Sequence, residues 1–356
     1  MKLLTVIGAR PQFIKAAVVS RAIKQRKDVR EVIVHTGQHF DNNMSDIFFE
    51  EMEIPKPDYN LNINGLGHGA MTGQMLEKIE EVLLKEKPDW VLVYGDTNST
   101  LAGSLAAKKL HIKVAHVEAG LRSFNMKMPE EINRILTDRI SDILFCPTQA
   151  AVDNLIKEGY KNFNAVIENV GDVMQDAALF YSKKLKKPET EIPERFVLCT
   201  IHRAENTDNP QAFKNIFEAL EEIATETPVV LPLHPRTRNK LKSQNYNFKD
   251  SSITFIEPVG YLEMLWLLQN CEMVMTDSGG LQKEAYFFMK QCLTIREETE
   301  WVELVDNGYN QICGRDKSKI ISTYKKLQSQ QQSNFVKKLY GDGKAGIKIV
   351  NQLLNL

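Results

Sequence analysis

The sequence predicts an α/β fold in which two Rossmann-like domains face each other across a cleft. Short apolar runs typical of buried strands alternate with longer, helix-compatible stretches along the whole chain. The chain has 356 residues, which is long for one hydrophobic core and comfortable for two domains. A polar, proline-bearing stretch at 182–193 separates the two series of strands and is typical of a surface connection.

Strands separated by helical patterns require right-handed crossovers, so both sheets are expected to be parallel. In such domains, ligands bind at the carboxyl ends of the strands, where polar residues follow each apolar run. The predicted strands are 3–8, 32–34, 90–94, 114–117 and 143–145 in the first half, and 195–200, 228–233, 253–256 and 272–276 in the second.

Residues 276–284, Thr-Asp-Ser-Gly-Gly-Leu-Gln-Lys-Glu, follow a predicted strand and open a helix-compatible stretch. The break at Ser278, Gly279 and Gly280 leaves backbone N–H groups at a helix start, and the missing glycine side chains let a phosphate approach. Glu284, on the helix beyond, suits two hydrogen bonds from a ribose diol. Phosphate donors beside a diol acceptor indicate a nucleotide site, and an ordinary strand-to-helix junction is the alternative.

At the start of the chain, the run 3–8 leads into a second strand-to-helix corner. Pro11 fits the first turn of a helix, where a missing N–H costs nothing. Arg10 projects from this corner and Lys15 lies one turn further along. Two cations there suit a pyrophosphate, since Arg binds such groups through two hydrogen bonds. The alternative is that both are solvated surface charges.

Composition narrows the class of partner. A net charge of −1 with mixed signs argues against nucleic acid and anionic membranes. No run of about 18 apolar residues is present to cross a bilayer, and the first apolar run is too short for a signal peptide. The five cysteines are widely spaced, without metal-ligand spacing, as in reduced proteins of the cytoplasm. The sequence thus predicts a soluble cytoplasmic protein.

Carboxylates follow two strands and open one helix in the first half. Asp96 follows strand 90–94, Glu118 follows strand 114–117, and the pair Glu130 and Glu131 opens the next helix. One member of this pair is expected to converge with the other two on one cleft. Clustered carboxylates raise each other's pKa, which makes one of them a candidate general acid at neutral pH.

Each carboxylate also has a structural alternative. Asp96 could cap a helix, Glu131 could form an ion pair with Arg134, and Glu118 could form one with Arg122. These alternatives stay open at the level of the residues.

Two histidines follow strands in the second half. His202 follows strand 195–200 and His234 follows strand 228–233, so either is a candidate phosphate donor or proton-transfer group, or a hydrogen-bonded structural residue. Neither has carboxylates at ligand spacing and no His-x-x-x-His motif occurs, so no metal site is predicted.

Seven segments together resemble the non-hydrolysing UDP-N-acetylglucosamine 2-epimerases, in one order and over essentially the whole chain. They are Gly-Ala-Arg-Pro-Gln-Phe-Ile-Lys at 8–15, Gly-Asp-Thr at 95–97, His-Val-Glu-Ala-Gly-Leu-Arg at 116–122, Pro-Glu-Glu-Ile-Asn-Arg at 129–134, His-Arg at 202–203, Thr-Asp-Ser-Gly-Gly-Leu-Gln-Lys-Glu at 276–284 and Tyr-Gly-Asp-Gly at 340–343. The resemblance implies glycosyltransferase-B-type architecture, with domains 1–170 and 171–340 and a C-terminal helix at 341–356 that joins the first domain. It also implies a homodimer.

The resemblance further implies an isomerase that inverts C-2 of a UDP-2-acetamido sugar. UDP is eliminated to give a glycal and then added back, with no NAD, metal or other cofactor. By motif, the acid/base carboxylates are Asp96, Glu118 and Glu130, joined by His202 as a catalytic residue. The residues implied to hold UDP are Arg10, Lys15, His202, His234, Ser278, Gly279, Gly280 and Glu284, with Glu284 on the ribose.

The chain departs from the commonest family pattern in three places. It has Trp301-Val302 where Arg-Pro is usual, which resembles a subgroup that epimerises UDP-2,3-diacetamido-2,3-dideoxy-glucuronic acid for bacterial surface polysaccharide. Lys283 replaces a usual Glu, a change expected to be tolerated. Gln38-His39 remain from the region of a second, activating UDP-sugar site, but Gln74 stands where an Arg is usual, which argues against such activation.

Two other classes of function stay open. A UDP-sugar-dependent glycosyltransferase of the same architecture also needs a nucleotide cradle, but does not need three acid/base carboxylates. A non-catalytic UDP-sugar sensor has no evident use for them either.

Overall fold

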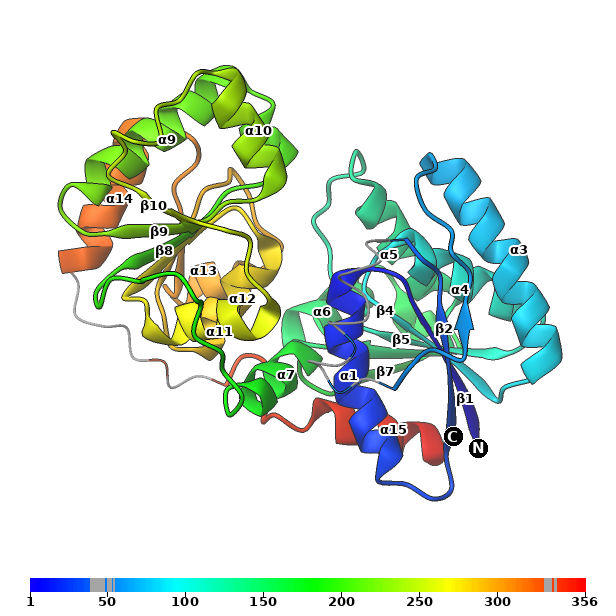
Figure 1. Cartoon of the computed structure of the whole chain (residues 1–356). Coiled ribbons are helices and arrows are strands. Elements are labelled where there is room, and N and C mark those ends of the chain that lie inside the picture. The colour runs from blue at the N-terminus through cyan, green and yellow to red at the C-terminus, as the bar shows by residue number, and fades with distance from the viewer. Residues whose placement is uncertain (39–48, 50–52, 54, 330–334, 336–337) are drawn as a thin grey trace. The chain divides into compact units, whose positions relative to one another are not determined.

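The computed structural model describes residues 1–38, 49, 53, 55–329, 335 and 338–356 (Figure 1). The chain forms two compact units, one of Met1–Leu179 with Lys338–Leu356 and the other of Phe180–Lys337. Each unit has its own sheet, and all strand pairs in both sheets are parallel. The α/β class and the two Rossmann-like domains are therefore confirmed, whereas the cleft between them stays a prediction.

The first unit is built on a parallel sheet with the strand order β3-β2-β1-β4-β5-β6-β7. Its central strands are apolar and buried on both faces, and all five residues of β4 are buried, as a parallel sheet between helical layers requires. The strands are β1 (Lys2–Ile7), β2 (Arg30–His35), β3 (Tyr59–Asn60), β4 (Trp90–Tyr94), β5 (Lys113–Val117), β6 (Ile143–Cys146) and β7 (Val166–Asn169).

Helices cover this sheet in two layers. Apolar side chains of α3 and α4 pack with those of β1, β2, β4 and β5 in one buried cluster. In Figure 1, the red C-terminal helix α15 lies beside the blue helix α1. A Cβ on Gly346 would lie 2.7 Å from Val18 Cγ1, so glycine permits this close packing. The helices of this unit are α1 (Arg10–Lys24), α3 (His68–Glu86), α4 (Asn98–Lys109), α5 (Pro129–Ile140), α6 (Gln149–Lys157), α7 (Val173–Tyr181) and α15 (Ala345–Leu354), with a short 3₁₀ turn at Tyr160–Asn162.

His35, at the end of β2, is 2% exposed, and its Nε2 has no hydrogen-bond partner among the described residues. Burial lowers the pKa of His35 to about 4, from 6.5. Between these values the unfolded chain binds the proton and the folded protein does not, so stability falls as pH falls through this window. The loss across the whole window is expected to reach about 3 kcal/mol.

Urea unfolding at pH 7 and pH 5 checks this expectation. His35→Phe keeps the ring contacts with Phe13 and Phe49, whose centroids lie 5.2 Å and 6.2 Å from that of His35, and removes the titrating group. The variant should lose less stability than the parent between the two pH values. Equal pH dependence in the parent and His35→Phe would contradict the assignment.

The second unit has a parallel sheet with the order β10-β9-β8-β11-β12-β13. Its core joins this sheet to α9 and α14, with Phe213, Ile216 and Tyr324 fully or almost fully buried. The strands are β8 (Val197–Thr200), β9 (Val229–Pro232), β10 (Thr254–Ile256), β11 (Met273–Thr276), β12 (Cys292–Thr294) and β13 (Asn310–Ile312). The helices are α8 (Ala204–Thr207), α9 (Pro210–Ala224), α10 (Pro235–Ser243), α11 (Tyr261–Asn270), α12 (Gly279–Phe287), α13 (Val302–Asp306) and α14 (Lys317–Ser329).

Each of the nine predicted strands overlaps an observed strand, while β3, β7, β12 and β13 were not predicted. The stretch 182–193 contains neither helix nor strand, as expected of a connection. Among the helices that the structure describes, none is both long enough and apolar enough to cross a bilayer.

Candidate active site

Both sheets reverse their strand order at an internal point, between β1 and β4 in the first unit and between β8 and β11 in the second. Loops leave such a switch point in opposite directions and open a crevice at the carboxyl ends of the strands, where ligands of this fold class bind. The segments with the predicted site residues Arg10, Asp96, His202 and Ser278 follow these four strands. The topology therefore brings the sequence motifs to one point in each unit.

Gln12 joins the two halves of the first switch point. Its side-chain oxygen accepts hydrogen bonds from Gly8 N at 2.8 Å and Ala9 N at 3.0 Å. Its Nε2 donates to the carbonyl oxygen of Tyr94 at 2.9 Å. Since Gln12 is 1% exposed, this clamp holds the β1–α1 corner against the end of β4.

The two cations of that corner have different surroundings. Arg10 begins α1, but its side chain lies outside what the structure describes. Lys15 is 8% exposed, and its Nζ forms an ion pair with Oε2 of Glu118. A contact between Lys15 and a diphosphate remains a prediction.

Lys15 and Glu118 meet beside Gly95, which precedes Asp96. A Cβ on Gly95 would lie 3.1 Å from Lys15 Nζ and 3.3 Å from Glu118 Oε2, and Gly95 has a φ of +62°. Glu118 itself has a φ of +74°, a conformation uncommon for a residue with a side chain. Such backbone strain concentrates at functional sites because the surrounding contacts must hold it.

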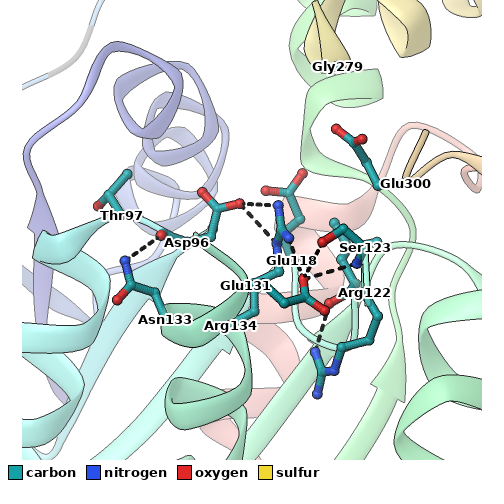
Figure 2. A network of polar contacts seen from close by, with 12 residues as sticks. Asp96, Thr97, Glu118, Arg122, Ser123, Glu131, Asn133, Arg134, Gly279 and Glu300 are labelled. Atoms are coloured by element: carbon teal, nitrogen blue, oxygen red, sulfur yellow. Dashed lines mark hydrogen bonds and ion pairs between the residues drawn. The ribbon is translucent and has the colours of Figure 1, made fainter. Parts of the chain in front are cut away.

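Asp96 is held by Arg134 from α5, as Figure 2 shows. Arg134 donates to Asp96 Oδ2 from Nε at 3.0 Å and from NH2 at 2.7 Å. Asn133 donates to the Asp96 carbonyl oxygen at 2.9 Å. No hydrogen bond to Oδ1 of Asp96 is found within the described part of the chain, and the side chain is 32% exposed. One carboxylate oxygen is thus anchored while the other is left for a ligand.

Glu131 holds the other side of Arg134, whose NH1 lies 2.6 Å from Glu131 Oε2. The same carboxylate accepts hydrogen bonds from Ser123 N at 3.0 Å and Phe124 N at 2.9 Å, so it anchors the loop before α5 (Figure 2). Burial acts to raise the pKa of Glu131, but these N–H groups and Arg134 hold it below the usual value. Glu131 is fully buried whereas Glu130 is exposed, so Glu130 is the member of the pair open to a ligand.

The structural alternatives for the carboxylates have mixed outcomes. The Glu131–Arg134 pair is confirmed. The Asp96 cap is wrong, because Thr97 caps α4 by accepting from Thr100 N. The Glu118–Arg122 pair is also wrong, since Glu118 contacts Lys15 and Arg122 pairs with two other carboxylates. The expected acidic cluster is therefore balanced by Lys15 and Arg134 within the first unit.

Asp277 organises the second switch point. It is fully buried and accepts hydrogen bonds from His202 N at 3.0 Å, Arg203 N at 2.9 Å and Asn206 Nδ2 at 3.0 Å. His202 Nδ1 lies 3.4 Å from Asp277 Oδ1. Burial lowers the pKa of His202, and Asp277 opposes this effect. The carboxylate thereby fixes the segment after β8 and the orientation of the imidazole.

His234 stands at the end of the neighbouring strand β9. It caps α10, since its Nδ1 accepts from Arg236 N at 3.2 Å. Its ring centroid lies 5.5 Å from that of His202. Burial lowers the pKa of His234, and the neighbouring His202 acts in the same direction. The structure thus brings His202 and His234 together, and the capping contact supports the structural alternative for His234.

The predicted nucleotide segment has the expected local geometry. α12 begins at Gly279, with Ser278 as its N-cap residue, whose side chain accepts from Leu281 N. Gly280 is exposed, and a Cβ on it would have no heavy atom within 4 Å. Glu284 lies on α12 and is 7% exposed. An open helix start next to His202 and Arg203 is suited to an anion.

Gly279 packs closely against its neighbours. A Cβ there would overlap Glu300 Oε1 and lie 3.7 Å from an Arg203 guanidinium nitrogen. Glu300 is held by Arg296, whose NH1 donates to Glu300 Oε2 at 2.9 Å. Burial acts to raise the pKa of Glu300, but Arg296 and Arg203 hold it below the usual value.

Two of the three departures from the common family pattern, Trp301 and Lys283, meet in space. Trp301 is 4% exposed, and its Nε1 donates to the Gly279 carbonyl oxygen at 2.8 Å. Lys283 Nζ lies 4.1 Å from the centroid of the Trp301 ring, within the range of a cation–π contact. The indole therefore forms part of the support beneath the α12 N-terminus.

Several organising residues were not singled out from the sequence, namely Gln12, Arg203, Asp277, Arg296 and Glu300. Most lie in or next to the motifs. Gln12 bonds Tyr94 across 82 positions and Asp277 bonds Arg203 across 74, so spacing carries no signal for these contacts, whereas Arg296 and Glu300 are four positions apart. Of the activating-site residues, Gln38 accepts from Ser99 N at 3.2 Å, and His39 lies outside the described residues. The structure shows no group of three or more possible metal-ligating side chains among the residues it describes.

Comparisons with known proteins give consistent results. A family model described as UDP-N-acetylglucosamine 2-epimerase matches residues 21–354. A UDP-2,3-diacetamido-2,3-dideoxy-D-glucuronate 2-epimerase from Pseudomonas aeruginosa is 57% identical, with 100% of both chains covered. The structure of a Methanocaldococcus jannaschii UDP-GlcNAc 2-epimerase in complex with UDP-GlcNAc and UDP is 45% identical, with 100% of both chains covered and a TM-score of 0.91. A Neisseria meningitidis UDP-GlcNAc 2-epimerase bound to UDP-GlcNAc is 33% identical, with 100% of both chains covered and a TM-score of 0.90.

Proposed function

The chain belongs to the UDP-N-acetylglucosamine 2-epimerase family and is a UDP-sugar 2-epimerase, and from this premise we propose that its substrate is UDP-2,3-diacetamido-2,3-dideoxy-D-glucuronate. The observation that carries the proposal is the 57% identity, across the whole of both chains, to an epimerase named for that sugar. Trp301-Val302 in place of the usual Arg-Pro supports the same choice, because this pair resembles the subgroup that epimerises the diacetamido uronic acid. The second candidate is UDP-N-acetylglucosamine.

UDP would be held in the second unit and by the N-terminal corner of the first. The α12 N-terminus at Ser278, Gly279 and Gly280 would bind the diphosphate, together with His202 and Arg10. Glu284 would accept the ribose hydroxyl groups. Helix-end N–H groups and cations stabilise the negative charge on departing UDP, which is where this reaction develops charge.

Carboxylates of the first unit would move the C-2 proton. One carboxylate removes this proton while the C-1–oxygen bond to UDP breaks, which leaves a C-1=C-2 glycal. A second group then delivers a proton to the opposite face of C-2, and the diphosphate oxygen adds back to C-1. Asp96, Glu118 and Glu130 are the candidates, and Arg134 and Lys15 fix the first two in position.

The uronic acid carboxylate of the proposed substrate needs a cation. Arg122 is excluded because its side chain is fully buried between Asp138 and Glu158. Arg134 binds Asp96 and Glu131 in the described structure, so its pairing with a substrate carboxylate would compete with these contacts. A site that buries a cation for this carboxylate should reject a sugar without it, because an unpaired buried charge is costly.

We further propose that the protein acts in the cytoplasm, as a homodimer, in the synthesis of a bacterial surface polysaccharide such as lipopolysaccharide. All five cysteines are buried thiols, which supports a reducing compartment. The resemblance to the family supports the dimer and the pathway.

The test is incubation with each UDP-sugar alone, in deuterated water and with EDTA, without added NAD or a sugar acceptor. We expect a second UDP-sugar carrying solvent deuterium at C-2, with faster turnover of the diacetamido uronic acid than of UDP-N-acetylglucosamine. Conversion of UDP-N-acetylglucosamine with no activity on the uronic acid would refute the substrate and leave the family reaction. Full retention of the substrate hydrogen would rule out the elimination route.

The same incubation distinguishes an epimerase from a glycosyltransferase of the same architecture. Without an acceptor, a glycosyltransferase would release no second UDP-sugar. The three candidate carboxylates of the first unit, Asp96, Glu118 and Glu130, favour the epimerase, since transfer of a sugar to an acceptor does not need three acid/base groups.

A further inference from the structure

His116, in the middle of the HVEAGLR motif, lies on β5 and is completely buried. Both ring nitrogens face oxygen atoms at hydrogen-bond distance. Nδ1 lies 2.7 Å from Asp138 Oδ1, and Nε2 lies 2.7 Å from the carbonyl oxygen of Gly95. Turning the ring by 180° would place carbon atoms against these oxygens, and 2.7 Å is too short for a C–H···O contact. The ring orientation is therefore determined by its contacts.

Neither oxygen can act as a donor. A carbonyl oxygen only accepts, and Asp138 is ionised in this environment. Its Oδ2 accepts from Gly120 N at 3.1 Å and from Arg122 NH1 at 2.7 Å. Burial acts to raise the pKa of Asp138, but His116 and Arg122 hold it below the usual value. Both nitrogens of His116 must then donate, and only the imidazolium form does so.

The charges of the cluster lead to the same conclusion. Arg122 is shared between Asp138 and Glu158. Its Nε donates to Glu158 Oε1 at 2.7 Å and its NH2 donates to Glu158 Oε2 at 2.8 Å. The charges of the four side chains, those of His116, Asp138, Arg122 and Glu158, sum to zero only when His116 is protonated. A neutral imidazole would leave one net negative charge where the side chains of His116, Asp138 and Arg122 are 0% exposed, which is costly.

Two neighbouring titratable groups, the Cys146 thiol and the Tyr160 hydroxyl, do not supply the missing charge. Burial raises the pKa of the Cys146 thiol well above its usual value and that of the Tyr160 hydroxyl, so both are neutral at physiological pH. Lys15 and Glu118, which lie beside Gly95, form an ion pair with each other.

The imidazolium acts on the peptide that precedes Asp96. Gly95 has a φ of +62°, and its N–H donates to the Val117 carbonyl oxygen at 3.0 Å. Its own carbonyl oxygen accepts from His116, and Lys15 and Glu118 pack against its α-carbon. Rotation of the Gly95–Asp96 peptide would break the hydrogen bond to His116 and re-aim the Asp96 side chain.

We propose that His116 is a permanently protonated positioning residue, locked as an imidazolium by Asp138, that pins the Gly95–Asp96 peptide and thereby aims Asp96 at the substrate. The protonation state stands on this cluster alone. Only the effect on turnover rests on the proposed function.

The first test is ¹⁵N NMR spectroscopy of the full-length protein labelled at histidine. His116, assigned through an Asp138→Asn variant, should show two protonated nitrogens from pH 6 to pH 9. The exposed His111, assigned through a His111→Gln variant, is the reference signal in the same spectra. A neutral imidazole at His116 in this interval would overturn the proposal, whatever the enzyme converts.

The second test compares two variants that each remove one carboxylate from Arg122. Asp138→Asn also removes the partner of His116, and Glu158→Gln does not. We expect Asp138→Asn to convert His116 to a neutral ring and to lower kcat by about tenfold or more, with KM little changed. Glu158→Gln removes one negative charge but leaves Asp138 and the Gly95 carbonyl oxygen as the two acceptors of His116, so these hydrogen bonds should keep the imidazolium signal and near-normal kcat.

The outcomes are distinct. Equal losses of kcat in the two variants, or a normal kcat in Asp138→Asn, would reduce His116 to a structural residue and overturn the positioning role. Absence of any epimerisation by the parent protein would count against the proposed function, while the NMR result would still decide the protonation state.

Discussion

Replacing Asp96, Glu118 or Glu130 with its amide is expected to lower turnover about a hundredfold or more while UDP binding stays largely intact. The amide keeps the shape of the side chain and removes its capacity to take or give a proton at neutral pH. Steady-state turnover and UDP calorimetry on the same preparations measure the two effects. Asp153→Asn, which neutralises an exposed carboxylate on α6, is the matched control and should retain full activity.

The three variants should differ in stability. Glu130 is exposed, so its amide should unfold like the parent. Glu118 forms a largely buried ion pair with Lys15, and breaking such a pair leaves an uncompensated charge, at a cost of up to about 3–5 kcal/mol. Normal turnover in all three variants would remove the acid/base assignment, and unchanged unfolding of Glu118→Gln would contradict the importance of the Lys15 pair.

The second large effect is expected in the nucleotide site. Glu284→Ala should weaken UDP binding by about 1–3 kcal/mol, since the ribose hydroxyl groups would lose a charged acceptor. Glu284 is 7% exposed on α12, one turn beyond the open helix start at Gly279 and Gly280. Calorimetric titration with UDP measures the loss.

Two further variants make this test specific. Glu284→Gln keeps an acceptor without the charge and should fall between the parent and Glu284→Ala. Glu257→Ala removes an exposed carboxylate of the same unit, paired with Arg238, and should not change UDP affinity. If Glu284→Ala bound UDP as tightly as the parent, with unchanged thermal unfolding, the ribose role would be wrong.

Local chemistry explains why much of the fold was accessible from the sequence. β4 is a run of five buried apolar residues and was predicted with its observed limits, because burial on both faces of a parallel strand demands such a run. The start of α12 was also accessible, since Ser278 and the two glycines after it carry the signals of a helix N-terminus. These signals arise within a few residues of each other.

The missed strands lacked such signals. β12 and β13 have three residues each, and β13 begins with Asn310 and Gln311. β7 ends in Glu168 and Asn169, and none of its residues is fully buried. Short strands and strands at the edge of a sheet tolerate polar residues. These segments therefore become strands because they pair with β6, β11 and β12, and not because of their amino-acid composition.

By itself, the sequence determined the class of fold, the position of each motif at a strand end, and the family. Only the tertiary structure decided how the charges pair. Glu118 meets Lys15 across 103 positions rather than Arg122, and Asp277 holds the backbone of His202 across 75. Arg134 joins Asp96 to Glu131, and His116 joins Asp138 to Gly95. A charged side chain takes the partner that the sheet order brings within reach, and strand order is a property of the folded chain, not of neighbouring residues.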